Sequence, residues 1–186
     1  YLPNVAAVQA LRASLPEDME PLLIQPLVAG QGAGVFGYAT SKGVLGWSGH
    51  RRLRMMNPHG SGSSACISAP PDAALRNKVT RFLDDIGWQG PFMVELLYAR
   101  DGTAWFMELN GRMWGSLALA RRQGIEYPAW AVARVLDHGF VPEPPAPDTR
   151  PLIMRELGRD LLHLLFVLRG PKSAFHRQGW PRFWRS

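Results

Sequence analysis

Apolar and polar residues follow one another in short blocks, and the spacing of the apolar residues predicts a helix or a strand for each block. Blocks with apolar residues three or four positions apart predict helices, expected over 5–15, 73–86, 116–123, 128–138 and 152–169. Shorter blocks rich in β-branched and aromatic residues predict strands, expected over 22–27, 35–40, 44–48, 51–54, 92–98 and 104–109. This order favours an α+β fold with an antiparallel sheet and packed helices.

Two short turns are expected to close β-hairpins. Ser41-Lys42-Gly43 separates one pair of predicted strands, and Arg100-Asp101-Gly102 separates another. Asp-Gly is a strong signal for chain reversal. Asp72 is suited to cap the helix that follows it, because a short acidic side chain can accept a hydrogen bond from the first helical turn.

The predicted helix over 152–169 carries a broad apolar stripe, made of Leu152, Ile153, Leu157, Leu161, Leu164, Leu165 and Leu168. The opposite face is charged and holds Arg155, Glu156, Arg159 and Asp160. The favoured interpretation is that the stripe packs on its own domain. The alternative is a docking helix for a missing domain, a partner or a membrane surface, with Trp180, Phe183 and Trp184 as an interfacial anchor between Arg182 and Arg185.

Composition narrows the class of protein. With 186 residues, of which 46% are hydrophobic, the chain is long enough for a real core. The net charge of +6 lies largely near the C-terminus, so nucleic-acid binding is not expected. The single cysteine, Cys66, excludes an intramolecular disulfide framework, and no apolar run approaches the length that spans a bilayer. A cytoplasmic protein is therefore expected.

A glycine-rich segment over 29–34 is expected to form a turn. Gly32, Gly34 and Gly37 match the G-x-G-x-x-G pattern of dinucleotide-binding proteins. That pattern requires a helix directly after the glycines and an acidic residue further on. Here a strand follows, so we interpret the glycines as residues that permit a tight turn and close approach of the backbone.

Carboxylate and amide side chains are concentrated in the second predicted hairpin. Glu108 and Asn110 are two residues apart on one strand and therefore share a face of it. Reflecting the two strands about Asp101 and Gly102 pairs Glu95 with Glu108. Three oxygen-bearing side chains are thus expected to converge.

Convergent carboxylates repel one another unless a cation lies among them, and hard oxygen ligands suit Mg²⁺ or Mn²⁺. Arg112 is expected two positions further along the same face, where its guanidinium could hold a phosphate or a carboxylate. The structural alternative is that Glu95 and Glu108 are solvated residues on a polar face. We favour the metal site because both strands, as judged from their apolar neighbours, look buried.

A family resemblance extends over about residues 22–138. The segment FMVELLYARDGTAWFMELNGRMWGSLALARRQGIEYP resembles the carboxy-terminal signature of ATP-grasp ligases, an acid followed after about a dozen residues by Glu-x-Asn-x-Arg. Upstream, LLIQPLVAGQGAGVFGY resembles the entry to the second ATP-grasp subdomain. SGHRRLR and HGSGSSACISAP resemble the strand and loop that close over the nucleotide in the branch of carbamoyl-phosphate synthetases.

The resemblance implies roles for individual residues. Glu95, Glu108 and Asn110 would hold magnesium, and Arg112 would be the catalytic residue that stabilises the transferred phosphoryl group. The expected nucleotide contacts are Gln25, Pro26, Leu27 and Val28 at adenine and ribose, together with His59, Arg52 and Arg54. Alternation along a strand cannot direct Arg51, Arg52 and Arg54 to the same side. A loop histidine without a role remains the alternative for His59.

The implied function is that of a fragment of an ATP-dependent ligase, which activates a carboxylate as an acylphosphate for capture by an amine or similar nucleophile. The expected units are a remnant of the lid subdomain (1–28), the metal- and nucleotide-binding subdomain (29–141), a proline-rich linker (142–150) and a helix with a basic, aromatic tail (151–186). The phosphate-binding lysine and lid loop of the family are not found, so the chain alone is expected to bind Mg-ATP weakly. A non-catalytic nucleotide-binding or interaction module is the alternative.

Overall fold

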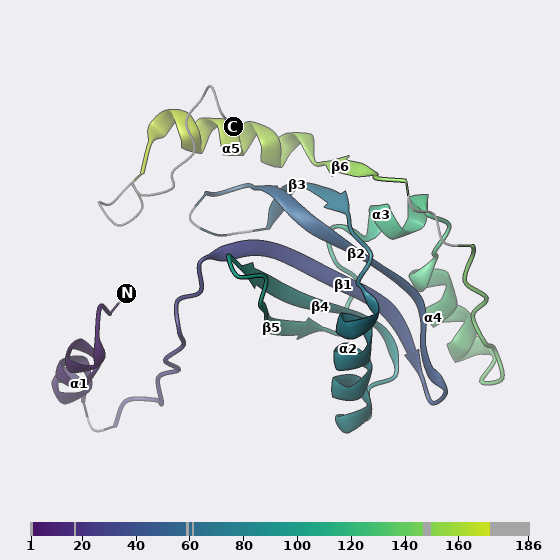
Figure 1. Cartoon of the computed structure of the whole chain (residues 1–186), viewed down its shortest axis with the longest axis horizontal. Coiled ribbons are helices and arrows are strands. Elements are labelled where there is room, and N and C mark those ends of the chain that lie inside the picture. Colours follow the sequence, from purple (N-terminus) through teal and green to yellow (C-terminus); the bar gives the residue numbers. More distant parts are fainter. Residues whose placement is uncertain (1, 17, 59, 61, 147–149, 172–186) are drawn as a thin grey trace.

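A six-stranded antiparallel sheet forms the centre of the molecule (Figure 1). The computed structural model describes residues 2–16, 18–58, 60, 62–146 and 150–171. The strands are β1 (Gly30–Thr40), β2 (Gly43–Met55), β3 (Ser63–Ser68), β4 (Gly90–Ala99), β5 (Ala104–Asn110) and β6 (Ile153–Arg155), in the spatial order β5-β4-β1-β2-β3-β6. The helices are α1 (Val5–Ser14), α2 (Ala73–Asp85), α3 (Leu117–Arg122), α4 (Tyr127–Leu136) and α5 (Leu157–Arg169). The predicted α+β class is confirmed.

Helix α2 covers one face of the sheet. Asp72 caps it as predicted, because its Oδ1 accepts a hydrogen bond from the Leu75 amide at 2.8 Å, and Gly87 follows its end with a φ of +65°. Leu75, Val79 and Leu83 point from α2 into a core built with residues of β1 and β4. This face of the sheet is apolar.

Helices α3 and α4 cover part of the opposite face. Aromatic side chains from the sheet and from the segment 114–130 form a second core, made of Phe36, Tyr38, Met93, Trp114, Ala120, Ile125, Tyr127 and Trp130. The buried Tyr127 hydroxyl donates to the Gly46 carbonyl and lies 2.9 Å from Ser48 Oγ. These bonds fix α4 to β2. Because α3 and α4 cover only one end of this face, the rest of it stays open along β4, β5 and the far end of β2.

The N-terminal segment differs from its prediction. Helix α1 forms where expected, but residues 22–27 form no strand and run as irregular chain into β1. Figure 1 shows α1 and this segment lying beside the sheet rather than within it. Leu23, Ile24 and Leu27 are 82%, 57% and 64% exposed. An apolar run without a neighbouring strand edge has no partner for its backbone, so composition alone does not make it a strand.

The C-terminal segment also differs from its prediction. The helix begins at Leu157 rather than near Leu152, because 153–155 pair with the edge strand β3 as β6. Glu156 then caps α5 by accepting from the Arg159 amide at 2.7 Å. The sheet therefore extends into the segment that the sequence assigned to the tail, and the division of the chain into functional units stays a prediction.

Helix α5 presents its polar side to the sheet. Asp160 Oδ2 accepts from Arg54 at 3.2 Å and from Arg155 at 2.7 Å, and His163 Nδ1 lies 2.8 Å from the Met55 carbonyl. Burial would raise the pKa of Asp160, but hydrogen bonds and the two guanidinium groups outweigh it and lower the pKa. Ion pairs therefore hold this helix together with the buried side chain of Val167.

Most of the apolar stripe of α5 is left in solvent, contrary to the interpretation that it packs on its own domain. Leu157, Leu161, Leu165 and Leu168 are between 53% and 77% exposed, whereas Leu164 is half-buried. The aromatic residues of the expected anchor lie outside the described residues. None of the helices in the described part of the chain is both long and apolar enough to cross a membrane.

Candidate functional site

The second hairpin places the predicted acidic residues together. Glu95 and Glu108 are direct cross-strand partners in the β4–β5 pair, as the reflection about Asp101 and Gly102 predicted. Asn110 lies opposite Met93, and its Nδ2 donates to Glu108 Oε1 at 2.8 Å. Because direct partners have Cα atoms about 4.5–5.5 Å apart, the two carboxylates share one small region of the sheet face.

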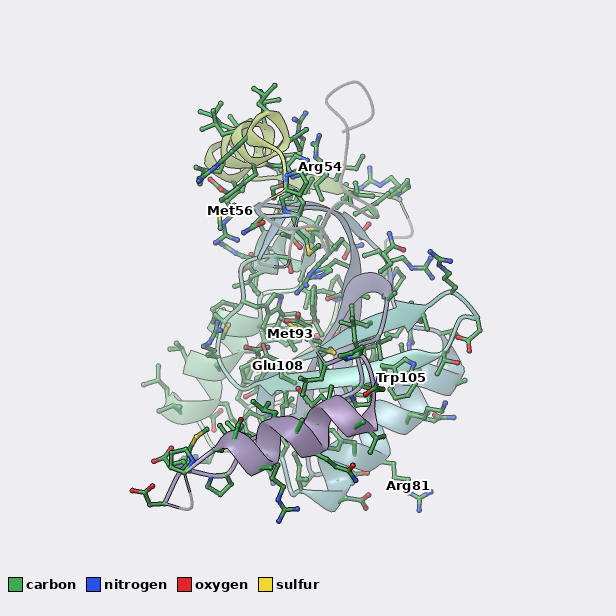
Figure 2. All side chains as sticks on the ribbon, turned by 90° about the vertical axis from the view of Figure 1, so that its left-hand side faces the viewer. Arg54, Met56, Arg81, Met93, Trp105 and Glu108 are labelled. Carbon is green, nitrogen blue, oxygen red and sulfur yellow. The ribbon has the colours of Figure 1, made fainter. Side chains whose placement is uncertain are left out.

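Strand β5 is more exposed than the sequence suggested. It is an edge strand of the sheet, and Trp105, Phe106 and Met107 are 44%, 51% and 46% exposed, whereas Phe92, Met93 and Val94 on β4 are buried. A bulge follows Glu95, so Phe106 turns toward α2 and packs on Phe82 with ring centroids 5.1 Å apart. Glu108 therefore lies at an open edge, where a ligand can reach it (Figure 2).

The glycine-rich segment lies within strand β1 and forms no turn. Gly34 pairs with His50 of β2 on one side and with Glu95 of β4 on the other. A Cβ atom at Gly32 would lie 2.6 Å from Arg52 Cδ and 3.1 Å from Arg52 Nε. The glycines thus leave room above β1 for the Arg52 side chain.

Arg52 uses this room to cross β1. It starts on β2, passes over Gly32 and donates from Nη2 to Glu95 Oε1 on β4. The two side chains are 16% and 21% exposed, so the pair is partly shielded from water. Arg51 points to the other face, where its guanidinium carbon lies 5.4 Å from the Tyr98 ring centroid. The expected alternation is confirmed for these two residues.

His50 lies beside this ion pair and is neutral at physiological pH. It is 4% exposed, and its Nδ1 lies 2.6 Å from Ser116 Oγ. Burial, with a smaller contribution from the positive charge of Arg52, lowers the pKa of His50 from 6.5 to about 4. Sequence analysis did not single out this residue, because nothing in the sequence shows that Ser116 reaches it from the α3 side.

An open groove of about 770 Å³ lies at the end of the sheet where β1 begins. Arg51, Arg52, Arg54 and Arg100 line it, and so do the backbone residues 29–32. Gln31 closes one side, since its Nε2 donates to the Arg52 carbonyl at 3.1 Å. No carboxylate is among the lining residues, and although Glu95 and Asp160 pair with Arg52 and Arg54, the cationic lining makes this groove suited to an anion.

The remaining predicted ligand residues are spread around this region. Gln25, Pro26, Leu27 and Val28 lie in the irregular chain that leads into β1. Arg54 lines the groove but pairs with Asp160 beneath α5 (Figure 2). His59 lies outside the described residues.

Arg112 lies beyond the end of β5 in a loop. It does not continue the face of Asn110, because the strand stops at residue 110, and its exposed guanidinium donates to the Met113 carbonyl at 3.3 Å. The intervening Gly111 has a structural reason: a Cβ there would lie 2.2 Å from Trp88 Cη2. The described structure therefore brings Arg52, Glu95, Glu108 and Asn110 together, whereas Arg112 lies in the loop after β5 and bonds to the Met113 carbonyl.

The donor set offers a divalent cation one unpaired carboxylate, from Glu108, and one amide oxygen, from Asn110. Magnesium takes one or two carboxylates and completes its shell with phosphate oxygens and water. Glu108 is open to such an ion, whereas Glu95 is already neutralised by Arg52. No group of three or more histidine, cysteine, aspartate or glutamate side chains that could hold a metal occurs among the described residues. Any ion here would therefore depend on the amide oxygen of Asn110 and on a ligand's own oxygens.

Comparisons with known proteins find partial likeness in structure. No family model matches the chain, and no curated protein matches it. An L-amino acid ligase from Bacillus licheniformis is similar at a TM-score of 0.48 and 20% identity, over 60% of this chain and 30% of that chain. A biotin carboxylase from Campylobacter jejuni, in complex with β-γ-ATP, is similar at 0.49 and 17%, over 61% and 26%.

A pyruvate carboxylase from Rhizobium etli is similar at a TM-score of 0.49 and 18% identity, over 75% of this chain and 14% of that chain. The chain thus spans less than a third of the length of each of these three proteins.

Replacing Gly32 by alanine should separate Arg52 from Glu95. The added Cβ would lie 2.6 Å from Arg52 Cδ, so the side chain must move away. We expect Gly32→Ala and Arg52→Gln each to lower the free energy of unfolding by about 1 kcal/mol, and the double variant to lose little more than one of them. Urea unfolding measures this, with Gly115→Ala as the control, since a Cβ there meets only an ordinary contact at 3.8 Å. Additive losses would contradict a shared cause.

Stability should depend on pH through His50. The unfolded chain binds a proton at this imidazole below about pH 6.5, whereas the folded chain does so only near pH 4. The contribution of His50 to the free energy of unfolding is therefore fully present above pH 6.5. It is lost, by up to about 3 kcal/mol, as the pH drops toward 4. Urea unfolding at several pH values between 4 and 7.5 measures this. The free energy of unfolding should change less with pH in His50→Gln than in the control His138→Gln, which alters an exposed residue. Equal slopes would mean that His50 does not carry the effect.

Proposed function

We propose that this chain is part of an ATP-dependent ligase of the ATP-grasp type, and that it contributes the residues that hold the metal and the phosphates. The observation that carries the proposal is the direct pairing of Glu95 with Glu108, with Asn110 on Glu108 and Arg52 on Glu95. Carboxylate, amide and guanidinium groups at one edge of a sheet suit a magnesium–phosphate ligand better than a purely structural ion pair.

The arginine-lined groove supports the same proposal. The phosphates of ATP carry negative charge that suits a groove lined by arginines, of which Arg51 and Arg100 have no carboxylate partner among the described residues. Residues 25–28 lead directly into its wall. The buried atoms Arg52 Nε and His50 Nε2 have no hydrogen-bond partner among the described residues. Unpaired buried polar atoms are uncommon, and a phosphate oxygen or a water molecule beside them would supply the missing acceptor or donor.

Each residue has a role in the proposed reaction. In the first step, an oxygen of the substrate carboxylate attacks the γ-phosphorus of ATP, the bond to the bridging oxygen of ADP breaks, and an acylphosphate forms. In the second step, the nitrogen of an amine attacks the acyl carbon and phosphate leaves. Bound Mg²⁺ would neutralise charge on the phosphate oxygens. Glu95, Glu108 and Asn110 would hold that ion, Arg52 would orient Glu95, and Arg112 would reach the transferred phosphoryl group from its loop.

A second candidate is a nucleotide-binding or interaction module without catalysis. The exposed leucines of α5 favour it, because an apolar helix face of this kind is typical of a contact with another protein surface. The two candidates differ in one measurable respect: only the ligase releases ADP in the presence of a carboxylate and an amine. The assay measures ADP released by the chain in the presence of ATP, Mg²⁺, a carboxylate and an amine.

Removing the Glu108 carboxylate should weaken magnesium-dependent nucleotide binding. We expect Glu108→Ala to weaken the binding of a non-hydrolysable ATP analogue in Mg²⁺ by about tenfold or more, because the ion would lose a charged ligand. Isothermal titration calorimetry measures the affinity with Mg²⁺ and with EDTA. The control is Glu143→Ala, an exposed acid in the segment after α4. Equal affinity of the two variants would contradict the assignment of the metal site.

A further inference from the structure

A second pocket lies at the opposite end of β1 from the arginine-lined groove. It has a volume of about 580 Å³ and is formed by the β1–β2 hairpin, the start of β4, helix α4 and the segment after it. The groove includes residues 29–32 of the chain and the pocket includes residues 38–42. With a rise of about 3.3 Å per residue, the two are about 20 Å apart along the strand. The proposed nucleotide site therefore does not include this pocket.

The floor and walls of the pocket are mainly apolar. Leu45, Pro91, Ala131, Val135 and Phe140 line it. Val135 is 73% exposed, so a ligand in the pocket can contact its side chain. Sites for small organic molecules share this character, with apolar walls and a few polar groups that fix orientation.

Two cations stand at the pocket and no carboxylate balances them. Lys42 comes from the hairpin turn and Arg134 from α4, and no aspartate or glutamate is among the lining residues. Neither cation forms an ion pair with an acid in the described residues; Arg134 makes only a long contact of 3.5 Å with the Phe140 carbonyl. Their charges are therefore available to a bound anion.

The pocket is held open by contacts behind its walls. Thr40 Oγ1 donates to the Gly43 carbonyl at 2.8 Å and accepts from the Lys42 amide at 3.2 Å, so the turn that carries Lys42 is fixed. Trp130 fixes α4 against the hairpin, since its ring lies 2.7 Å from where a Cβ of Gly46 would be and 6.1 Å from the Tyr38 ring. Because the side chains and the turn that form this pocket are already fixed, binding a small ligand would cost little conformational entropy.

From these observations we propose that the pocket binds a small organic acid, with its apolar body against Leu45, Val135 and Phe140 and its carboxylate between Lys42 and Arg134. The buried Tyr38 supplies a neutral hydroxyl at the inner wall, where burial raises the pKa of the phenol despite the positive charge of Arg134. This site goes beyond the proposed ligase function, because it shares no residue with the groove.

Binding of 3-phenylpropionate to the full chain tests the proposal, with the neutral 3-phenylpropanamide as the matched probe. Isothermal titration calorimetry without nucleotide or metal should give an affinity about tenfold higher for the acid than for the amide. Lys42→Gln/Arg134→Gln should remove that difference, whereas Lys78→Gln/Arg81→Gln, which neutralises two exposed cations on α2, should keep it. Val135→Trp, which fills the pocket, should weaken both probes.

Each contrary result would overturn the proposal. Absence of acid binding, equal affinity for acid and amide, or an equal effect of the two double variants would show that the cations do not recognise a carboxylate. Full retention of binding in Val135→Trp would place the ligand elsewhere. Displacement of the acid by inorganic phosphate alone, with no contribution from the phenyl group, would show recognition of charge without the apolar walls. None of these readouts depends on ATP or Mg²⁺, so failure here and failure of the ligase proposal are distinguishable.

Discussion

The ion pair between Arg52 and Glu95 is the interaction on which the candidate site depends. It joins two strands that are not neighbours, because β1 lies between β2 and β4 in the sheet. The guanidinium can reach the carboxylate only because Gly32 has no side chain to block its path. One arginine thereby fixes the acid that faces Glu108, and the same side chain enters the arginine-lined groove. Arg52 would then contribute both to phosphate recognition and to the metal site. Fixed positive charge of this kind stabilises the transition state of phosphoryl transfer.

The two faces of the sheet have different physical functions. The α2 face is a continuous apolar core, which supplies the stability of the fold. The other face is divided: α3 and α4 pack on aromatic residues at one end, ion pairs hold α5 near the other, and the polar site lies between them. This division leaves Glu108 and the groove accessible, and it leaves the leucines of α5 in solvent.

The sequence predicted the local features well and the long-range ones poorly. The α2 cap followed from Asp72, because it depends on residues close in the chain. The predicted pairing of Glu95 with Glu108 is confirmed, but the pairs next to the Asp-Gly turn are shifted by one residue, and the bulge between Glu95 and Leu96 restores the predicted register. The glycine-rich segment was assigned to a turn, but it lies within β1. Its glycines are needed there because the Arg52 side chain of the neighbouring strand β2 passes over them, and that contact is not visible in the sequence. The prediction that the apolar face of α5 packs on the domain failed because it, too, depended on residues distant in the chain. Its polar side packs inward because Arg54 and Arg155 from two strands meet Asp160, and no periodicity reveals that.

The central claim is that Glu95, Glu108 and Asn110 form one metal site beside bound nucleotide phosphates. The most direct measurement is paramagnetic broadening of amide resonances by Mn²⁺ in the full chain with a non-hydrolysable ATP analogue, since broadening falls steeply with distance from the ion. If these residues hold the ion, their amides should broaden first and should recover when excess Mg²⁺ displaces Mn²⁺. Broadening centred instead on the exposed acids Asp84 and Asp85 of α2, or no localised broadening, would contradict it.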